Sequence, residues 1–487
     1  MNTLPLVLDL IIAQALLGAF DTLYHHELRA ALPQQPSAAL ELKIHAGRSF
    51  VYGLLFVGLA WLAWGGVWLL LLAAMLFTEV VLTLWDFLVE DRSRILPPAE
   101  RVLHTIMALN GGAAFAFLCL FAPIWWRLPN RLQFTTHGWQ TIVLSVFAVG
   151  VVASALRDGR AGSALRQRSE RTPDIHFARA AQSLLITGGT GFIGQELCRA
   201  LLADGHELTL LARDPLKTAY LFDGRVHCVT RLDDLDPGTR FDVVINLAGE
   251  RILGPRWTPA RRQKLVDSRV GTTSGLVAWI ARATHKPRLM ISASAVGYYG
   301  VQDPGDPTVL TETAAGQQDF VSEICQHWED AARGVFIYSV PLAILRLGIV
   351  LGHQGALPLM RLPFLAGVGG RLGSGRQVVS WIHIEDVLGA IAHIMANPNA
   401  RNAEAIYNLT APQPVTQNEF ARTLARVLHR PSLLPMPAGV LRLILGEQAM
   451  LLLEGQRACP ARLEEDSYHF HFPQLEPALR DLCVASH

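Results

Sequence analysis

Charged residues are scarce in this chain of 487 residues. Asp, Glu, Lys and Arg make up only 17% of it, against about 25% in a typical soluble domain. The scarcity is uneven, because residues 1–156 hold 17 charges and residues 157–487 hold the other 66 of 83. This composition excludes a disordered or collagen-like chain, and it predicts an apolar membrane part joined to an ordinary soluble part.

Three other features are missing. A net charge of +1 gives no basic field, so we expect no nucleic-acid partner. The six cysteines include no CxxC pair, which is typical of a protein in a reducing compartment and argues against a disulfide framework or a zinc site. No positively charged segment precedes the first apolar run, so we expect no cleaved signal peptide.

Five apolar stretches lie in the N-terminal part, each close to the ~20 residues that cross hydrocarbon. Only Gly65 and Gly66 separate the second stretch from the third. The alternative is that these two stretches form one long broken helix, which would give four spans in total. With five spans, the inner loops and residues 157–171 carry eleven Lys or Arg, whereas the outer segments carry two. This bias predicts an inner-membrane protein with its N-terminus outside and its soluble part in the cytoplasm. The five stretches are Leu4–Tyr24, Ser49–Trp64, Val67–Val89, Val102–Trp125 and Gly138–Leu156.

This topology gathers the ionisable residues of the spans at the inner face. Two interpretations are open: a carboxylate–histidine metal or cofactor site, and an interfacial network of salt bridges. We favour the network, because the ExxH pairs of di-iron bundles and the histidine boxes of membrane desaturases are absent. The candidate metal ligands under the first interpretation are Asp21, His25, His45, Asp86, Glu90 and His104.

From Ser183 the pattern changes to alternating strands and helices. The expected strand Ser183–Thr187 runs into GGTGFIG, followed by a helix over Gln195–Ala203 and a second strand over Glu207–Leu211. This is the order of a dinucleotide-binding βαβ unit, in which the glycines let the backbone approach the pyrophosphate at the helix N-terminus. Arg213 follows the second strand, where an Arg suits the 2′-phosphate of NADP and an acidic residue would suit NAD.

Later segments extend this unit into a doubly wound parallel sheet. Ligands of such sheets bind at the carboxyl ends of the strands, which here carry Glu250 and the segment 292–299. The further strands expected are Asp242–Leu247, Arg288–Ser292 and Ala343–Leu347, with helices near Thr258–Ala283 and Phe320–Arg333.

Six motifs then occur in order: TGGTGFIG, INLAGE, SASAVGYYG, LRLGIVLG, GSGRQVVSWIHIEDV and LLLEGQRACPARL. Residues 183–483, which contain them, resemble the epimerase-like subfamily of atypical extended short-chain dehydrogenases/reductases. The resemblance implies an NADP-binding Rossmann core with a smaller α/β lobe over about 352–380 and 405–483. The cofactor contacts that it implies are Gly188, Gly191, Phe192, Ile193, Gly194, Arg213, Leu247, Ala248, Gly249, Arg269 and Val350.

We therefore expect three parts: an α-helical transmembrane bundle over 1–156, a basic linker over 157–180, and a reductase-like domain over 181–487. The linker would lie in the cytoplasm, against the anionic inner leaflet of the lipid bilayer.

The catalytic residues are less well defined. Extended reductases use a Ser or Thr, a Tyr and a Lys, and Ser294 matches the first of these. The helix that should supply YxxxK, residues 320–333, contains neither Tyr nor Lys. Tyr298, Tyr299 and His383 are the candidate proton donors in their place. Each also has a structural interpretation, which is ring packing for the tyrosines and a helix-start contact for His383.

Two classes of function follow. The first is a membrane-anchored NADP(H)-dependent oxidoreductase or epimerase that acts on a small or lipid-like substrate in the membrane. The second is a non-catalytic NADP-binding protein, a redox sensor or scaffold related to the cell envelope or to division. A retained cofactor site is compatible with both, and the substrate, the reaction direction and the oligomeric state stay open.

Overall fold

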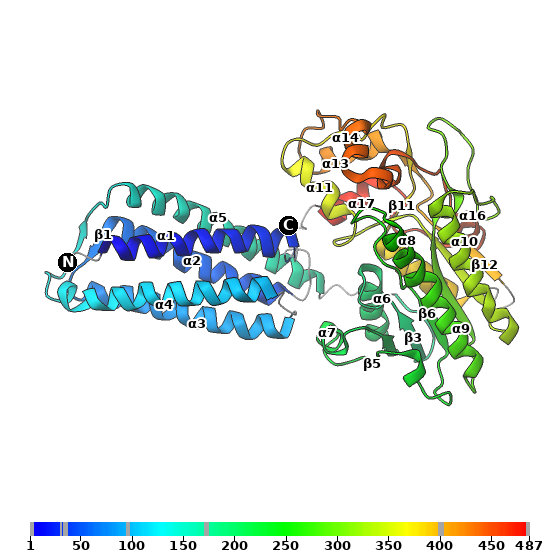
Figure 1. Ribbon diagram of the computed structural model, residues 1–487, viewed down its shortest axis with the longest axis horizontal. Coiled ribbons are helices and arrows are strands. Elements are labelled where there is room, and N and C mark those ends of the chain that lie inside the picture. Colours follow the sequence, from blue (N-terminus) through cyan, green and yellow to red (C-terminus); the bar gives the residue numbers. More distant parts are fainter. Residues whose placement is uncertain are drawn as a thin grey trace. The chain divides into compact units, whose positions relative to one another are not determined.

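The computed structural model describes residues 4–29, 32, 38–93, 98–169, 175–397 and 404–483. It divides into two compact units, Met1–Arg171 and Thr172–His487. Residues 170–174 of the expected linker lie outside the described residues. Figure 1 shows long helices in the first unit, and a sheet flanked by helices in the second.

The first unit is a bundle of five long helices with a short two-stranded ribbon. Each helix is long and apolar enough to cross a membrane, with a mean hydropathy between 1.2 and 2.0 in its most apolar window. The elements are α1 (Leu4–Phe20), the π-helix η1 (Asp21–Arg29), α2 (Ala39–Trp61), β1 (Leu62–Trp64), α3 (Trp68–Ser93), α4 (Pro98–Trp126), β2 (Leu132–Phe134) and α5 (Trp139–Ser169).

The second and third spans are separate helices. The chain leaves the helical conformation at Leu62, and β1 pairs antiparallel with β2, so the alternative of one long broken helix is wrong. Gly66 then turns the chain with a φ of 58°. The helix α2 begins at Ala39, ten residues before the apolar stretch expected at Ser49. Hydropathy alone misses this first part, because it contains charged residues that lie inside the bundle, such as Glu41.

The helices α2 and α5 pack against each other more extensively than any other pair. Glycines allow this approach: a Cβ at Gly53 would lie 2.7 Å from Val152, and one at Gly162 would lie 2.9 Å from the Ala39 carbonyl oxygen. The second contact lies beyond Leu156, where the sequence predicts the start of the linker. Residues 157–169 are therefore part of α5, and Gly162 and Leu165 pack against other residues of the bundle.

The bundle has its apolar side chains outside and many of its charges inside. Phe77, Leu109 and Val149 are at least 71% exposed, whereas Glu90 and Asp86 are at most 1% exposed. A soluble bundle shows the reverse distribution. The outer surface is thus of the kind that lipid covers.

The second unit is built on a seven-stranded sheet. Its helices and strands are β3 (Ser183–Thr187), α6 (Phe192–Ala203), β4 (Glu207–Leu211), α7 (Pro215–Leu221), β5 (His227–Val229), η4 (Leu232–Asp234), β6 (Val243–Asn246), α8 (Pro259–Val266), η5 (Asp267–Gly271), α9 (Thr272–Arg282), β7 (Leu289–Ala295), η6 (Val296–Tyr299), α10 (Phe320–Arg333), η7 (Gly334–Tyr338), β8 (Leu342–Leu347), β9 (Ile349–Leu351), α11 (Leu357–Leu365), β10 (Val378–Val379), β11 (Trp381–His383), α12 (Ile384–Ala396), β12 (Glu404–Leu409), β13 (Val415–Thr416), α13 (Gln417–Val427), α14 (Ala438–Leu445), η9 (Gly446–Ala449), α15 (Met450–Leu453), α16 (Ala461–Glu465) and α17 (Leu475–Cys483).

The strand order is β12-β8-β7-β6-β3-β4-β5, and all neighbours are parallel. This confirms the doubly wound parallel sheet. The strands β3 and β4 have the predicted bounds, and Ser183 pairs with Glu207 at their start. The order reverses between β3 and β6, which is the place where such sheets bind ligands.

Alternate residues of the strands face two separate cores. Leu184, Ile186 and Ile245 pack on one side against residues of α6 and α12. Leu185 and Val244 pack on the other side against α9. Helices therefore cover both faces of the sheet, which explains why its strands are continuous apolar runs.

A third core lies in the smaller lobe, where α13 packs against α17. The second segment of the lobe begins later than the predicted Ala405. The reason is that β12 pairs with β8 from Glu404 to Leu409 and so belongs to the main sheet.

Candidate functional site

The turn between β3 and α6 depends on three glycines. Gly188 has a φ of 73°, and a Cβ there would lie 2.5 Å from the backbone of Leu247. A Cβ at Gly194 would lie 2.2 Å from the carbonyl oxygen of Gly188. At Gly191 the nearest atom to a Cβ, the Gly188 oxygen at 3.2 Å, belongs to the turn itself. The first and third glycines thus allow close packing, and the second leaves its outer side open for a ligand.

The helix α6 starts directly from this turn. Gly191 is its N-cap residue, and no described side chain caps it. Backbone N–H groups of a first helical turn, here those of Phe192 and Ile193, bind anions well because they are unpaired within the helix and lie at its positive end. The turn therefore fits a pyrophosphate.

The predicted contacts around this turn come together. Leu247 and Ala248 follow β6 and lie against Gly188. Val350, in β9, packs into the same apolar cluster as Phe192 and Leu247.

Arg269 supports the loop that follows β6. Its guanidinium lies 3.3–3.6 Å from the position of a Cβ on Gly249, and it donates a hydrogen bond to the Glu250 carbonyl oxygen at 3.0 Å. On its other side it faces the ring of Trp328. Burial lowers the pKa of Arg269.

Arg213 follows β4, the strand that pairs with β3, and its side chain is exposed. The next residue, Asp214, caps α7 by accepting a hydrogen bond from the Lys217 amide at 3.1 Å. Glu250 accepts a hydrogen bond from Arg261 at 2.9 Å, which lowers its pKa, and the charge of Arg213 contributes in the same direction. Glu250 is therefore ionised and engaged with Arg261.

The catalytic candidates Ser294 and Tyr299 lie in one buried network. Ser294 donates a hydrogen bond to Glu329 at 2.8 Å, and Arg346 donates two to the same carboxylate at 2.9 Å. Arg346 also donates to the Tyr299 oxygen at 3.0 Å, and Tyr299 donates to Asn408 at 2.7 Å. All five side chains are at most 2% exposed.

Tyr298 belongs to the same region, whereas His383 does not join the network. The guanidinium of Arg346 lies 3.4 Å from the centre of the Tyr298 ring. His383 caps α12, where its Nδ1 accepts a hydrogen bond from the Glu385 amide at 3.2 Å. Its ring packs against that of Phe472, with the ring centres 3.9 Å apart and the planes tilted by 32°. These contacts agree with the structural interpretations, and the catalytic roles stay predictions.

Two residues that sequence analysis did not select occupy the helix of the missing YxxxK. Cys325 and Glu329 lie four residues apart on α10, the same separation as the Tyr and Lys of that motif, and Glu329 contacts Ser294. Burial and the nearby Glu329 charge raise the pKa of Cys325 to about 12, so its thiol stays protonated at neutral pH. The spacing was a usable signal, but neither residue type is found in the usual motif.

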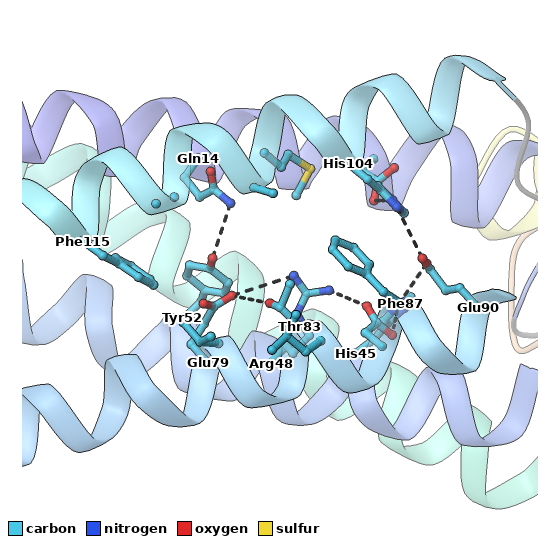
Figure 2. Close-up of a pocket in the computed structure, with 18 of the residues that line it drawn as sticks. Gln14, His45, Arg48, Tyr52, Glu79, Thr83, Phe87, Glu90, His104 and Phe115 are labelled. Carbon is cyan, nitrogen blue, oxygen red and sulfur yellow. Dashed lines mark hydrogen bonds and ion pairs between the residues drawn. The ribbon is translucent and has the colours of Figure 1, made fainter.

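The first unit contains a cavity of about 280 Å³. Figure 2 shows labelled side chains from several helices around it, with His104 and Glu90 toward one end and Gln14 with Tyr52 further along. Its walls include apolar residues, such as Leu84, Phe87, Met107 and Phe115.

The six metal-ligand candidates lie together beside this cavity. His25 contacts Asp21 at 2.9 Å, His104 contacts Asp21 at 3.1 Å and Glu90 at 3.3 Å, and His45 contacts Asp86 at 3.1 Å and Glu90 at 3.9 Å. Three further residues join them: His26, Glu100 and Arg48, of which Arg48 pairs with Asp86. The apolar stretch predicted from Ser49 leaves Arg48 outside the second span, because the sequence does not show that α2 starts at Ala39.

Comparison with known proteins identifies the second unit. The model of the NAD dependent epimerase/dehydratase family matches residues 184–410, and a domain of unknown function, DUF1731, matches 436–482. The epimerase family protein YfhF of Bacillus subtilis is 36% identical over 307 residues, which are 62% of this chain and 97% of the relative. The chain belongs to this epimerase family.

Other members of the epimerase family agree with this. The human epimerase family protein SDR39U1 is 36% identical over 61% of this chain and 99% of its own length. A crystal structure of its isoform 2, determined with NADPH, matches with a TM-score of 0.54 and 35% identity over 62% of this chain and 98% of that one. The family model covers the glycine turn after β3, because it matches residues 184–410.

The substitution Glu329→Gln tests the buried network. It leaves the Arg346 charge buried without its ionic partner, so we expect a loss of about 3–5 kcal/mol in stability. The control is Asp330→Asn on the same helix, which affects an exposed pair with Arg333 and should cost about 0–1 kcal/mol. Thermal unfolding of the full chain measures both, and equal shifts would contradict the network.

Proposed function

We propose that this chain is a membrane-anchored NADP(H)-binding protein that acts as an oxidoreductase or epimerase on a membrane-associated or lipid-like substrate. The geometry of Gly188, Gly191 and Gly194 carries the nucleotide-binding part of the proposal, because each glycine has the environment that a pyrophosphate-binding turn requires. The NADPH in the crystal structure of the human relative supports the choice of nucleotide.

The residues of this chain would hold the nucleotide at the carboxyl edge of the sheet. The first-turn amides of α6 would bind the pyrophosphate, and Arg213 would bind the 2′-phosphate. Leu247 and Gly249 would lie against the nucleotide from the next strand. When bound, the nicotinamide supplies or accepts a hydride.

Hydride transfer to or from a substrate carbon also needs a group that exchanges a proton with the substrate oxygen. Tyr298 is half-buried, and the Arg346 guanidinium lies 3.4 Å from the centre of its ring. Tyr299 is hydrogen-bonded on both sides, and burial raises its pKa. Tyr298 is therefore the candidate that we favour for proton transfer to or from a substrate oxygen.

A second candidate function has a specific observation in its favour. Glu329 pairs with Arg346 and accepts a hydrogen bond from Ser294, so a carboxylate occupies the place where extended reductases hold their Lys. Such a site suits a protein that binds NADP(H) without turning it over, as a redox sensor or scaffold.

The distribution of side chains in the first unit supports membrane anchoring. Five helices meet the length and hydropathy that a span needs, and their large apolar side chains face outward. Within this unit, the end of the bundle that contains Arg127 and Arg131 also contains the start of α1, because Gln140 donates a hydrogen bond to the Pro5 carbonyl oxygen at 3.1 Å. The positive-inside rule then favours an external N-terminus and a cytoplasmic second unit.

The substitution Arg213→Ala tests nucleotide selection. Loss of a hydrogen bond to a charged phosphate costs about 1.5–3 kcal/mol, so the dissociation constant for NADPH should rise about tenfold or more, with little change for NADH. Arg225→Ala is the control, since Arg225 is also exposed and pairs with Asp223 at 3.8 Å. Fluorescence titration of the full chain measures both nucleotides. Equal losses for NADPH and NADH would overturn the role of Arg213.

Turnover separates the two candidate functions. We expect the full chain in detergent to oxidise NADPH with at least one class among quinones, polyprenyl carbonyls and isoprenoid carbonyls. The variant Tyr298→Phe should then slow turnover and leave NADPH binding unchanged. Tight binding of NADPH with no turnover of any class would favour the sensor or scaffold instead.

Labelling of introduced cysteines in intact cells tests the orientation. The two substitutions are Thr136→Cys and Asp223→Cys. Thr136 is exposed in the segment after β2, and Asp223 is exposed at a turn of the second unit. A membrane-impermeant maleimide should label the first and not the second, with the unsubstituted chain as the background. The opposite pattern would reverse the predicted topology.

A further inference from the structure

Histidine and carboxylate side chains in the first unit converge on two small volumes. Asp21, His26, Glu100 and His104 form one group, and His26 also belongs to a second group with His45 and Glu90. In each group, one potential ligand atom from every residue lies within 4.8 Å of all the others. We propose that the four-residue group binds one divalent transition-metal ion.

The distances within this group fit a metal site. Bonds from such an ion to nitrogen or oxygen are about 2.0–2.2 Å, so neighbouring ligand atoms of a tetrahedral site lie about 3.3–3.6 Å apart. The His26 Nε2 atom lies 3.4 Å from Asp21 and 3.8 Å from Glu100, and the His104 Nε2 atom lies 3.1 Å from the same Asp21 oxygen. Two of these distances are longer than those of ordinary hydrogen bonds, yet the atoms still face a common point.

The π-helix η1 produces this convergence. Its backbone hydrogen bonds join residues five apart, so Asp21 and His26 can lie on the same side, which a regular α-helix would not allow. A regular α-helix would place His25, four residues on, beside Asp21. In the structure His25 contacts the other oxygen of Asp21, Oδ1, at 2.9 Å, and leaves Oδ2 for His26 and His104.

Neighbouring groups hold the proposed ligands in place. The Nδ1 atom of His104 faces Glu90 at 3.3 Å, so a carboxylate lies behind a histidine whose Nε2 points into the group. Metal-binding histidines in proteins are commonly oriented in this way. In the same way, His25 contacts the Oδ1 atom of Asp21 and helps to orient that carboxylate. Figure 2 shows His104 and Glu90 joined by such a contact beside the cavity.

Buried carboxylates gather around the proposed site. They include Asp21, Glu41, Glu79, Asp86, Glu90 and Glu100. Arg48 contacts two of them, Asp86 and Glu79. Negative charge is costly in an apolar bundle, and a divalent ion would offset part of it at this place.

The donor set indicates the class of metal. Two imidazoles and two carboxylates suit Zn²⁺, Fe²⁺ or Mn²⁺, and the group contains no thiolate or thioether that would select Cu(I). The cavity of about 280 Å³ includes Asp21, His26 and His104 in its wall, so an ion there would have a side open to water or a small apolar molecule.

Metal binding by the full chain in detergent tests the proposal. After chelator treatment and dialysis, we expect about one equivalent of Zn²⁺, Fe²⁺ or Mn²⁺ to bind per chain, and Co²⁺ to give the intense visible absorption of a four-coordinate site. Glu100→Gln and His104→Gln should each weaken binding at least tenfold. His137→Gln is the matched control, because His137 lies in the segment after β2 and outside both groups.

Two further measurements separate a loss of metal binding from a folding defect and from a change in nucleotide binding. Glu100→Gln keeps the shape of the side chain, and thermal unfolding of the metal-free variants shows whether they fold. NADPH titration of the same samples reports on the second unit separately. No bound metal at micromolar concentrations, or equal losses in the His104 and His137 variants, would overturn the proposal in favour of a salt-bridge network.

Discussion

The nucleotide site depends on how closely the turn after β3 approaches the loop after β6. Gly188 and Gly194 bring backbone atoms to distances that no Cβ would permit, and this fixes where the first turn of α6 points. The strand order reverses at the same place, between β3 and β6, so the helix end lies at the edge of the sheet where ligands bind. The alternating cores on the two faces of the sheet hold this arrangement, because they fix the register of every strand.

The bundle is governed by a different constraint, the cost of ionisable groups among apolar helices. Its exterior is apolar, so the carboxylates and histidines have to satisfy one another inside. The π-helix at Asp21–Arg29 brings His26 into the bundle. The start of α2 at Ala39 places His45 and Arg48 on a helix, where they reach the buried carboxylates. The salt-bridge network and the metal site are two ways to satisfy the same buried carboxylates, and they differ in whether side chains alone or also a bound ion do so.

Much of the second unit could be predicted, because its signals are local. The strands Ser183–Thr187 and Glu207–Leu211 flank a glycine turn whose spacing is itself the signal, and both occur as predicted. The network of Ser294, Glu329 and Arg346 could not be predicted, since its members come from different elements and meet only in the tertiary structure. In the first unit, hydropathy located the five helices but placed the ends of α2 and α5 wrongly, because charged residues that face the interior look like loop residues in the sequence.

The proposed function depends on where NADPH binds to the second unit. A structure of the full chain determined with NADPH tests it most directly. We expect the pyrophosphate on the amides of Phe192 and Ile193, and the 2′-phosphate within hydrogen-bond distance of the Arg213 guanidinium. A nucleotide bound elsewhere, or a 2′-phosphate that points away from Arg213, would contradict the account.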